Sequence, residues 1–310
     1  MVLPRTSFGI HTTADEVAAG VDLHGKQVIV TDGSSGIGFE TARVLANRGA
    51  AVTITARNLF SGELIAADIR ELTNNQSVRT AELDLSDRRS INRFLKSWEK
   101  PVDILINNAS VLGIPALEHT ADGWELHFAT NFLGHFELTV GLFEHLVAAA
   151  DGARVVSVSS GAHLFCPVVF DDINFKFRGY DAMIAYGQSQ TATILLAVAI
   201  SAQWASAGIV ANAVNSGSTA IDGQRNTPQQ SDQSGLVTAP EHRKTVLEGA
   251  ATPLFAAVSP ILDGVGGRYL EDCNEAPLVD HRTADLMGVA PYALDVDNAE
   301  RLWAHAILRL

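Results

Sequence analysis

Residues 27–50 read QVIVTDGSSGIGFETARVLANRGA, and the fold can be worked out from this stretch. It opens with an apolar β-branched run at residues 28–30, which predicts a buried strand of a parallel sheet. Three glycines crowd into residues 33–38 and predict a tight turn. Apolar residues then recur at helical spacing until Gly49, which predicts a helix that ends there.

Strand, glycine turn and helix in this order are typical of the start of a dinucleotide-binding unit. Glycines let the backbone approach a pyrophosphate, and the first turn of the helix offers free N–H groups and the positive end of its dipole. A second strand, at residues 51–56, follows at the distance that a βαβ unit requires. The residues that we expect to face the cofactor at this turn are Asp32, Gly33, Ser35, Gly36, Ile37 and Gly38.

Composition limits the class of protein. The chain has 310 residues, of which 47% are hydrophobic, so it can bury a large core within one domain. Its net charge is −13 at pH 7, and an acidic chain without a basic run argues against binding to nucleic acid or to a membrane surface. The most apolar helical stretch, near residues 193–202, is expected to be too short to span a bilayer.

Cysteine and histidine patterns exclude further kinds of site. Cys166 and Cys273 have no CxxC spacing and no signal-peptide pattern opens the chain, so we expect a cytoplasmic protein without a disulfide. The ten histidines show no ligand spacing such as H-E-x-x-H, and we expect no metal site. His163 is close enough in sequence to a Ser-Ser pair to reach a site there, but we expect it to have a packing or a surface role.

Strand and helix patterns alternate along the chain. Strands are predicted at residues 27–31, 51–56, 80–84, 104–107, 154–159, 210–214 and 268–270. Further helices are predicted at residues 61–72, 90–98, 117–150 and 180–207. This order predicts an α/β fold with a single Rossmann-type, doubly wound parallel sheet and helices on both faces. We expect one dinucleotide-binding-type domain over residues 1–310, with an N-terminal arm at residues 1–25 and a polar substrate lid at residues 218–240.

Short motifs follow the glycine turn in a recognisable order. They are Asp84-Leu85, Asn107-Asn108-Ala109-Ser110, Asn131, Ser159-Ser160, Tyr186 and Ser216-Gly217. In this order and spacing the chain resembles the short-chain dehydrogenase/reductase superfamily over nearly its whole length. It is most similar to the retinol-dehydrogenase-like branch, on the stretches 170–180, 185–189 and 266–273.

The resemblance implies a role for each matching residue. Tyr186 would be the general acid that protonates a carbonyl while hydride arrives from a nicotinamide, and a phenol with a pKa near ~10 must be tuned for this work. Ser160 would hydrogen-bond the carbonyl, and Asn131 would hold a water of the proton relay. Asp84 would meet the adenine edge of the cofactor. Further residues that would line the cofactor are Leu85, Asn108, Ala109 and Gly217.

The same residue types have ordinary structural uses. A tyrosine on an apolar helix often packs, and Ser-Ser or Asn-Asn pairs often satisfy local backbone groups. Arg57 follows the second strand, where a basic residue suits the 2′-phosphate of NADP and an acidic one suits NAD. A solvent-facing arginine at the end of a strand, with no role in binding, would give the same sequence pattern. If a dinucleotide binds, we expect it to be NADP(H).

The chain departs from the family pattern at three positions. Asp32 stands where the family has a glycine, and it puts a negative charge near an anionic cofactor. Gln190 stands where the family has a lysine, one helical turn after the tyrosine of the site and on the same face. Its amide can hold the nicotinamide ribose, but it cannot lower a tyrosine pKa by charge. Ser216 replaces a proline, which changes loop stiffness.

These departures leave three functions open. The first is an NADP(H)-dependent oxidoreductase, with weak or absent cofactor binding, acting on a carbonyl or alcohol of a hydrophobic small molecule. The second is a non-redox cyclase, dehydratase or isomerase on the same scaffold, in which Tyr186, Ser160 and Asn131 polarise a carbonyl or move a proton. The third is a catalytically silent binding subunit. We expect a small-molecule substrate as partner, and the resemblance makes a homo-oligomer plausible.

Overall fold

The computed structural model describes residues 3–219 and 243–308. Eight strands form one sheet in the order β3-β2-β1-β4-β5-β6-β7-β8. All neighbouring strands are parallel except β7 and β8, which pair antiparallel. The strands are β1 Gln27–Val30, β2 Ala51–Ala56, β3 Arg79–Glu82, β4 Ile104–Asn107, β5 Ala153–Ser159, β6 Ile209–Asn215, β7 Tyr269–Glu271 and β8 Asn274–Glu275. The predicted doubly wound parallel sheet is confirmed.

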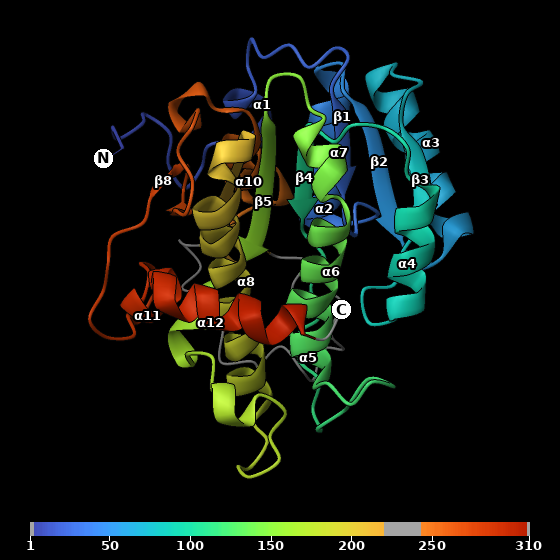
Figure 1. Ribbon diagram of the computed structural model, residues 1–310. Coiled ribbons are helices and arrows are strands. Elements are labelled where there is room, and N and C mark those ends of the chain that lie inside the picture. The colour runs from blue at the N-terminus through green and yellow to red at the C-terminus, as the bar shows by residue number, and fades with distance from the viewer. Residues whose placement is uncertain (1–2, 220–242, 309–310) are drawn as a thin grey trace.

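Helices cover both faces of this sheet (Figure 1). The α-helices are α1 Ala14–Val17, α2 Gly36–Asn47, α3 Leu59–Thr73, α4 Arg88–Ser97, α5 Leu126–Phe128, α6 Gly134–Gly141, α7 Phe143–Val147, α8 Ala182–Trp204, α9 Val246–Gly249, α10 Ala251–Val258, α11 Pro291–Leu294 and α12 Val296–Ile307. A π-helical turn, η1 Ala129–Leu133, joins α5 to α6, and a 3-10 turn, η2 Gly161–Phe165, follows β5. Crossover helices on both faces are what parallel neighbouring strands require.

Side-chain alternation along the strands builds one core on each face. On β1, Ile29 packs into the core formed with α4, α6, α8 and α12. Its neighbours Val28 and Val30 pack into the opposite core, with α2, α3 and α10. Leu105 and Ile106 on β4 divide between the two cores in the same way. Both faces are therefore buried, which explains why these strands read as continuous apolar runs.

One predicted helix begins later than its sequence suggests. Residues 117–125 were expected to be helical, but they form a loop in which His119 bridges to Glu125. Gly123 turns the chain with a φ of 82°. Glu125 then caps α5 by accepting hydrogen bonds from the first backbone N–H groups of the helix. The prediction is wrong over residues 117–125 because a turn glycine and a capping carboxylate both favour a start at residue 126.

α8 lies within the helix predicted at residues 180–207, but its apolar part extends beyond the stretch noted at residues 193–202. Residues 182–207 form a stretch long and apolar enough to cross a membrane by length and composition alone, so the expectation of too short a helix is wrong. However, 89% of the most apolar window is buried inside the fold. α8 packs on β5 and β6, and its apolar character serves the core. Both cysteines, Cys166 and Cys273, are free and buried.

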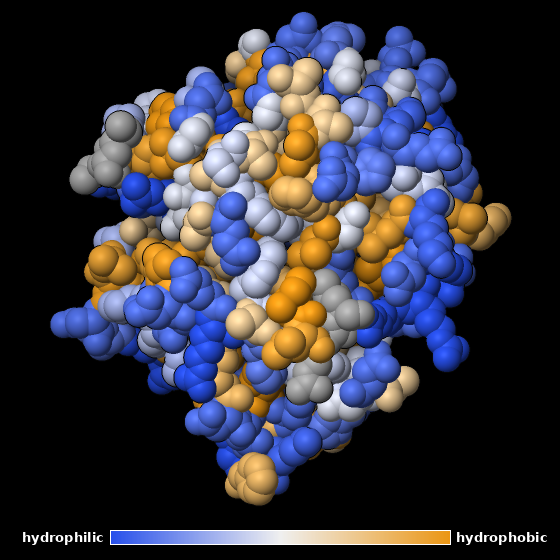
Figure 2. Space-filling model, in the orientation of Figure 1, coloured by the Kyte–Doolittle hydropathy of each residue, from blue (hydrophilic) through white to orange (hydrophobic). Residues whose placement is uncertain are grey.

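The chain segments at both ends pack on the fold. α1 starts with a capping box between Thr13 and Glu16 and packs on α10. α12, which the sequence patterns did not predict, crosses over α8 and α6 (Figure 1). Trp303 of α12 lies edge-on to Phe136, with ring centroids 4.9 Å apart, and to Trp204, at 5.4 Å. Apolar patches interrupt the otherwise polar surface of this face (Figure 2).

Candidate active site

The glycine turn brings the backbone of β1 close to the start of α2. A Cβ on Gly38 would lie 2.4 Å from the carbonyl oxygen of Asp32, so a side chain cannot be placed there without moving the backbone. Gly36 opens α2 with a φ of 54°. Ser35, the N-cap residue, makes no side-chain capping hydrogen bond. The first N–H groups of α2 therefore lack a side-chain cap, as in helices that bind phosphate.

Asp32 occupies the turn in a left-handed conformation, with a φ of 49°. Glycine adopts this conformation without strain, and aspartate tolerates it better than most residues do. The Asp32 carboxylate accepts a hydrogen bond of 3.3 Å from Ser34 Oγ, which lies within the same turn. The departure at Asp32 is thus accommodated by the local backbone.

Thr31 ties the glycine turn to the end of β4. Its Oγ1 accepts hydrogen bonds from the backbone N–H groups of Asn108 (2.8 Å) and Ala109 (2.9 Å). Asn108 Nδ2 donates in return to the carbonyl oxygen of Thr31 at 2.9 Å. The predicted cofactor residues on β1 and β4 therefore lie side by side at the carboxyl end of the sheet, where the strand order reverses.

A buried histidine joins this turn to the segment that carries Asn131. His135 Nδ1 lies 2.9 Å from the carbonyl oxygen of Asn131, and its Nε2 lies 2.9 Å from Thr31 Oγ1. Burial lowers the pKa of His135 to about 4, so the ring is neutral near pH 7. Nδ1 then donates to the carbonyl, and Thr31 donates its hydroxyl proton to Nε2.

Two other predicted cofactor residues form the next loop. The Asp84 carboxylate accepts hydrogen bonds from the backbone N–H and the hydroxyl of Ser86, at 2.9 and 2.6 Å. Leu85 packs against Gly134, where a Cβ would come within 2.3 Å of the Leu85 carbonyl oxygen. Arg57, directly after β2, is exposed, and its side chain has no hydrogen bond or ion pair among the described residues.

Tyr186 and Gln190 lie one turn apart on α8, and both are buried. Gln190 Nε2 donates to Ser110 Oγ at 3.4 Å, so the amide spans from α8 to the loop after β4. Ser160 begins η2, and its Oγ accepts from the backbone N–H of Ala162 at 3.2 Å. The Ser160 O–H therefore keeps a proton to donate.

Asn131 sits within the π-helical turn η1, an irregularity often found at functional sites. Its side chain accepts from the backbone N–H of Val111 at 2.7 Å and donates to the carbonyl oxygen of Val111 at 3.0 Å. Its Nδ2 also lies 2.9 Å from Ser189 Oγ. The amide thus fixes the loop after β4 against α8, directly beside Tyr186.

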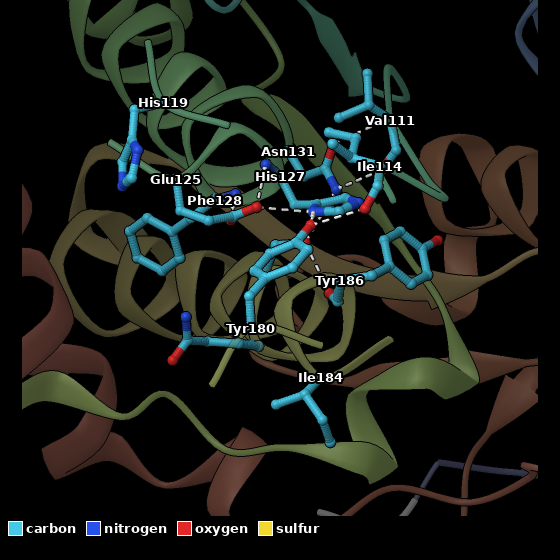
Figure 3. A network of polar contacts seen from close by, with 12 residues as sticks. Val111, Ile114, His119, Glu125, His127, Phe128, Asn131, Tyr180, Ile184 and Tyr186 are labelled. Carbon is cyan, nitrogen blue, oxygen red and sulfur yellow. Dashed lines mark hydrogen bonds and ion pairs between the residues drawn. The ribbon is translucent and has the colours of Figure 1, made fainter. Parts of the chain in front are cut away.

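Three residues that the sequence analysis missed belong to the polar network drawn in Figure 3, and one of them, His127, lies with its ring against Tyr186. Glu125 accepts a hydrogen bond of 2.8 Å from His127 Nδ1, and both side chains are fully buried. Tyr180 donates its hydroxyl proton to the carbonyl oxygen of Ile114 at 2.9 Å. Its oxygen lies 3.5 Å from His127 Nδ1. The only sequence signal was a Glu-x-His pair at a helix start.

A second buried polar cluster lies at the carboxyl ends of β6 and β7. The Glu271 carboxylate accepts from Asn215 Nδ2 at 3.0 Å and from the backbone N–H of Gly288 at 2.8 Å. Burial raises the pKa of Glu271 to about 7. Lys244 pairs with Asp272 at 2.5 Å and lies against Gly217.

Two further predictions concern this region. His163 is fully buried and joins the Ser160 carbonyl oxygen to the backbone N–H of Ala290, so its expected packing role is confirmed. Residues 220–240 of the predicted lid lie outside the described residues. The segments on either side of that stretch meet, because Lys244 N–H donates to the Ser218 carbonyl oxygen at 2.9 Å.

Comparison with known proteins places this geometry in a family. A family model described as short chain dehydrogenase matches residues 26–232. The chain belongs to the short-chain dehydrogenase family. A Streptomyces antibioticus protein named "Probable oxidoreductase" is 41% identical over 292 residues, which cover 92% of this chain and 97% of the relative. Retinol dehydrogenase 12 of Mus musculus is 38% identical over 286 residues, covering 91% of this chain and 85% of the relative.

Solved structures agree with the fold. An uncharacterised protein from Mycobacterium paratuberculosis superposes with a TM-score of 0.72 at 30% identity, covering 94% of this chain and 96% of the other. The NADP complex of Pseudomonas aeruginosa RhlG superposes with a TM-score of 0.62 at 25% identity, covering 81% and 95%. This short-chain dehydrogenase is therefore an enzyme of an oxidoreductase family with retinol-dehydrogenase-like relatives.

Proposed function

We propose that the protein is an NADP(H)-dependent oxidoreductase that acts on a carbonyl or alcohol of a hydrophobic small molecule. The observation that carries the proposal is the chain of hydrogen bonds that connects the turn of α8 carrying Tyr186 with the glycine turn. Ser189 donates to the carbonyl oxygen of Tyr186 and accepts from Asn131 Nδ2, and the backbone of Asn131 reaches the turn through His135 and Thr31. An acid–base pair and a phosphate-binding turn thus belong to one connected site.

The turn fits a dinucleotide on its own geometry. The close approach at Gly38 leaves the backbone accessible to a pyrophosphate, and the side chain of Ser35 does not cap α2. Arg57 is exposed after β2, where its guanidinium can meet a 2′-phosphate. The NADP complex of RhlG supports the same cofactor. When bound, the cofactor supplies or accepts the hydride.

The residues of this chain then divide the remaining work. Ser160 donates a hydrogen bond to the substrate oxygen and so holds that oxygen in place. Tyr186 gives its phenolic proton to that oxygen in reduction and takes it back in oxidation. Asn131 holds the loop after β4 against α8 through Val111 and Ser189, which fixes the part of α8 that carries Tyr186. Burial of Tyr186 limits the access of water to the proton transfer.

Further observations support the substrate class and the location. The retinol dehydrogenases among the relatives support a hydrophobic alcohol or aldehyde. The burial of the long apolar helix α8 inside the fold, and two free cysteines, support the cytoplasmic location that the sequence suggested. We also propose that the protein forms a homo-oligomer. α12 packs on α8 and contacts α6 through Trp303, so it covers part of the surface of these two helices.

The experiment combines binding with turnover. Calorimetric titration should give tighter binding of NADPH than of NADH, and NADPH should be consumed with at least one aldehyde of a panel that includes retinal. Tyr186→Phe keeps the ring and removes the proton, so turnover should fall at least about tenfold while NADPH binding persists. Equal affinities for the two nucleotides would refute the NADP assignment, and full activity of Tyr186→Phe would refute the role of the tyrosine.

A second function is favoured by one observation. The buried neutral amide of Gln190, bonded to Ser110, stands where the family has a lysine, so it supplies no charge to Tyr186. A non-redox reaction that only moves a proton or polarises a carbonyl would tolerate this better than hydride transfer would. Product analysis by mass decides: a product isomeric with the substrate, or dehydrated, without consumption of NADPH supports this function.

A further inference from the structure

The segment at residues 276–290, which joins β8 to α11, packs on the turn that Ser160 begins (Figure 1). A Cβ on Gly161 would lie 2.3 Å from the carbonyl oxygen of Leu286 and 2.9 Å from the Cβ of that residue. Any side chain at position 161 would therefore push Leu286 away. Because Gly161 directly follows Ser160, Leu286 packs beside the residue whose hydroxyl holds the substrate oxygen in the proposed reaction.

A second glycine brings the same turn close to α8. A Cβ on Gly187 would lie 2.6 Å from the carbonyl oxygen of Ala162, so η2 rests directly on the backbone of the helix. Gly187 follows Tyr186 in the chain, just as Gly161 follows Ser160. Two close backbone contacts thus bring α8, η2 and the segment at residues 276–290 together around the proposed acid–base pair.

The backbone of Leu286 is left-handed, with a φ of 57°. A bulky side chain rarely tolerates this conformation, because its Cβ crowds the backbone. Neighbouring groups hold it there. The Leu286 N–H donates to the carbonyl oxygen of Thr283 at 3.3 Å, and Thr283 Oγ1 donates to the carbonyl oxygen of Met287 at 2.7 Å. Strained residues that their surroundings hold in place cluster at ligand sites.

Contacts on both sides of Leu286 hold the segment against η2. Before it, the guanidinium of Arg282 lies over the ring of Phe165, 4.3 Å from the ring centroid. After it, the backbone N–H of Ala290 donates to His163 Nε2 at 3.2 Å. Phe165 and His163 both belong to η2. The position of Leu286 relative to Ser160 is therefore fixed from two directions.

The side chain of Leu286 is partly exposed and belongs to neither of the two hydrophobic cores described above. The same holds for Val111, Ile114 and Ile184, which Figure 3 shows around Tyr186. Apolar side chains that stay outside a core and surround a few polar groups are typical of a small-molecule site. The isobutyl group of Leu286 is thus available to contact a ligand.

We propose that Leu286 lines the substrate site beside Ser160 and selects aldehydes and primary alcohols over ketones and secondary alcohols. The inference rests on the oxidoreductase function proposed above and names the substrate class of that site. Ser160 holds the carbonyl oxygen, so a side chain packed beside it stands near the two substituents of the carbonyl carbon. An aldehyde has hydrogen as one of these substituents, whereas a ketone has a carbon group that competes with Leu286 for space.

The test compares isomeric carbonyls as substrates with NADPH. Octanal and methyl hexyl ketone have the same atoms and differ in the position of the carbonyl group. In Leu286→Ala, the ratio of kcat/KM for the ketone to kcat/KM for the aldehyde should rise by about tenfold, with KM for NADPH unchanged. A merely structural role would lower both values together and leave their ratio as it was.

Leu278→Ala is the matched control. It makes the same substitution in the same segment, at a side chain that is 66% exposed, and it should leave the ratio unchanged. If Leu286→Ala does not fold, Leu286→Gly takes its place, because glycine adopts a left-handed backbone without strain. Leu286→Gly should raise the ratio at least as much.

Binding gives a second readout that needs no turnover. Octanol, a primary alcohol, should slow amide hydrogen exchange at residues 277–290 of the unaltered protein. Its isomer with the hydroxyl on the second carbon should slow this exchange much less in the unaltered protein, but as strongly as octanol in Leu286→Ala. Leu278→Ala should respond to the two alcohols as the unaltered protein does.

The two proposals fail in different ways. An unchanged ratio in the Leu286 variants, or a lack of protection by either alcohol in the unaltered protein, overturns the inference and leaves the NADPH binding assays untouched. Conversely, a protein that consumes no NADPH with any carbonyl refutes the oxidoreductase function. The role of Leu286 survives in that case if hydrogen exchange still shows a preference for octanol that Leu286→Ala removes.

Discussion

The two ends of the site are built by different means. At the cofactor end, backbone atoms approach one another closely, as Gly38 and Asp32 do, and backbone N–H groups at Asn108 and Ala109 bond to one threonine hydroxyl. At the catalytic end, buried side chains such as Glu125 and His127 bond to one another. The first end depends on glycine and on local order in the chain. The second depends on which distant side chains the fold brings together.

The largest expected effect is a loss of affinity for NADPH at the cofactor end. Gly38→Ala places a Cβ 2.4 Å from a backbone oxygen that cannot rotate away. NADPH affinity should fall by about a hundredfold, which corresponds to about 3 kcal/mol, measured by calorimetric titration. Gly9→Ala is the matched control, because no atom lies within 4 Å of its Cβ, and it should bind as the unaltered protein does. Normal binding by Gly38→Ala would mean that the cofactor does not use this turn.

The next prediction tests the histidine that links the two ends. The pKa of His135 is about 4 in the folded protein because of burial, below its ordinary 6.5. As pH falls from 6.5 to 4 the unfolded chain binds a proton that the folded one does not, so folding loses up to about 3 kcal/mol.

Urea unfolding at pH 7 and pH 4.5 should show this loss, and it should be smaller in His135→Gln. His163, with the same lowered pKa of about 4, contributes equally to both proteins, so the difference between them isolates His135. Glu271 acts oppositely, since its raised pKa of about 7 favours the folded state as pH falls toward 4.5, again in both proteins. An equal pH dependence in the two proteins would contradict a neutral, buried His135.

The smallest expected effect is a change in the rate of reduction at the catalytic end. Gln190→Lys adds a cation one turn from Tyr186, and NADPH-dependent carbonyl reduction should rise by about tenfold. Gln190→Met, which has neither charge nor donor, is the control and should not gain activity. A loss of native turnover in Gln190→Lys, without any gain in reduction, would instead favour the non-redox function.

The sequence predicted the strands around the glycine turn well for a physical reason. The strands at residues 51–56 and 104–107 were predicted with the bounds that the structure has, because β-branched apolar runs end there at polar turn residues. The glycine turn is a local motif whose chemistry depends on neighbours within about ten residues. Left-handed Asp32 is an example: its strain and its contact with Ser34 both arise within the turn.

The catalytic end was predicted less completely because its contacts are long-range. Gln190 was recognised from its place four residues after Tyr186, but its partner Ser110 is 80 residues away. Glu125 and His127 were not singled out from the sequence, because residues 117–150 were predicted as helical, and only the packed fold buries both side chains. β8 was missed because two residues carry no periodicity, and its turn at Asp272 and Cys273 uses positive φ values without glycine.

α12 has a consequence for how the surface of α6 and α8 behaves on dilution. Trp303 reaches Phe136 and Trp204 as part of the same chain, so its docking is an intramolecular equilibrium. A tether of this kind gives an effective concentration on the order of millimolar, whatever the amount of protein in solution. Mass action therefore does not uncover the surface at low concentration, and any second molecule that binds there must first compete with a helix that never diffuses away.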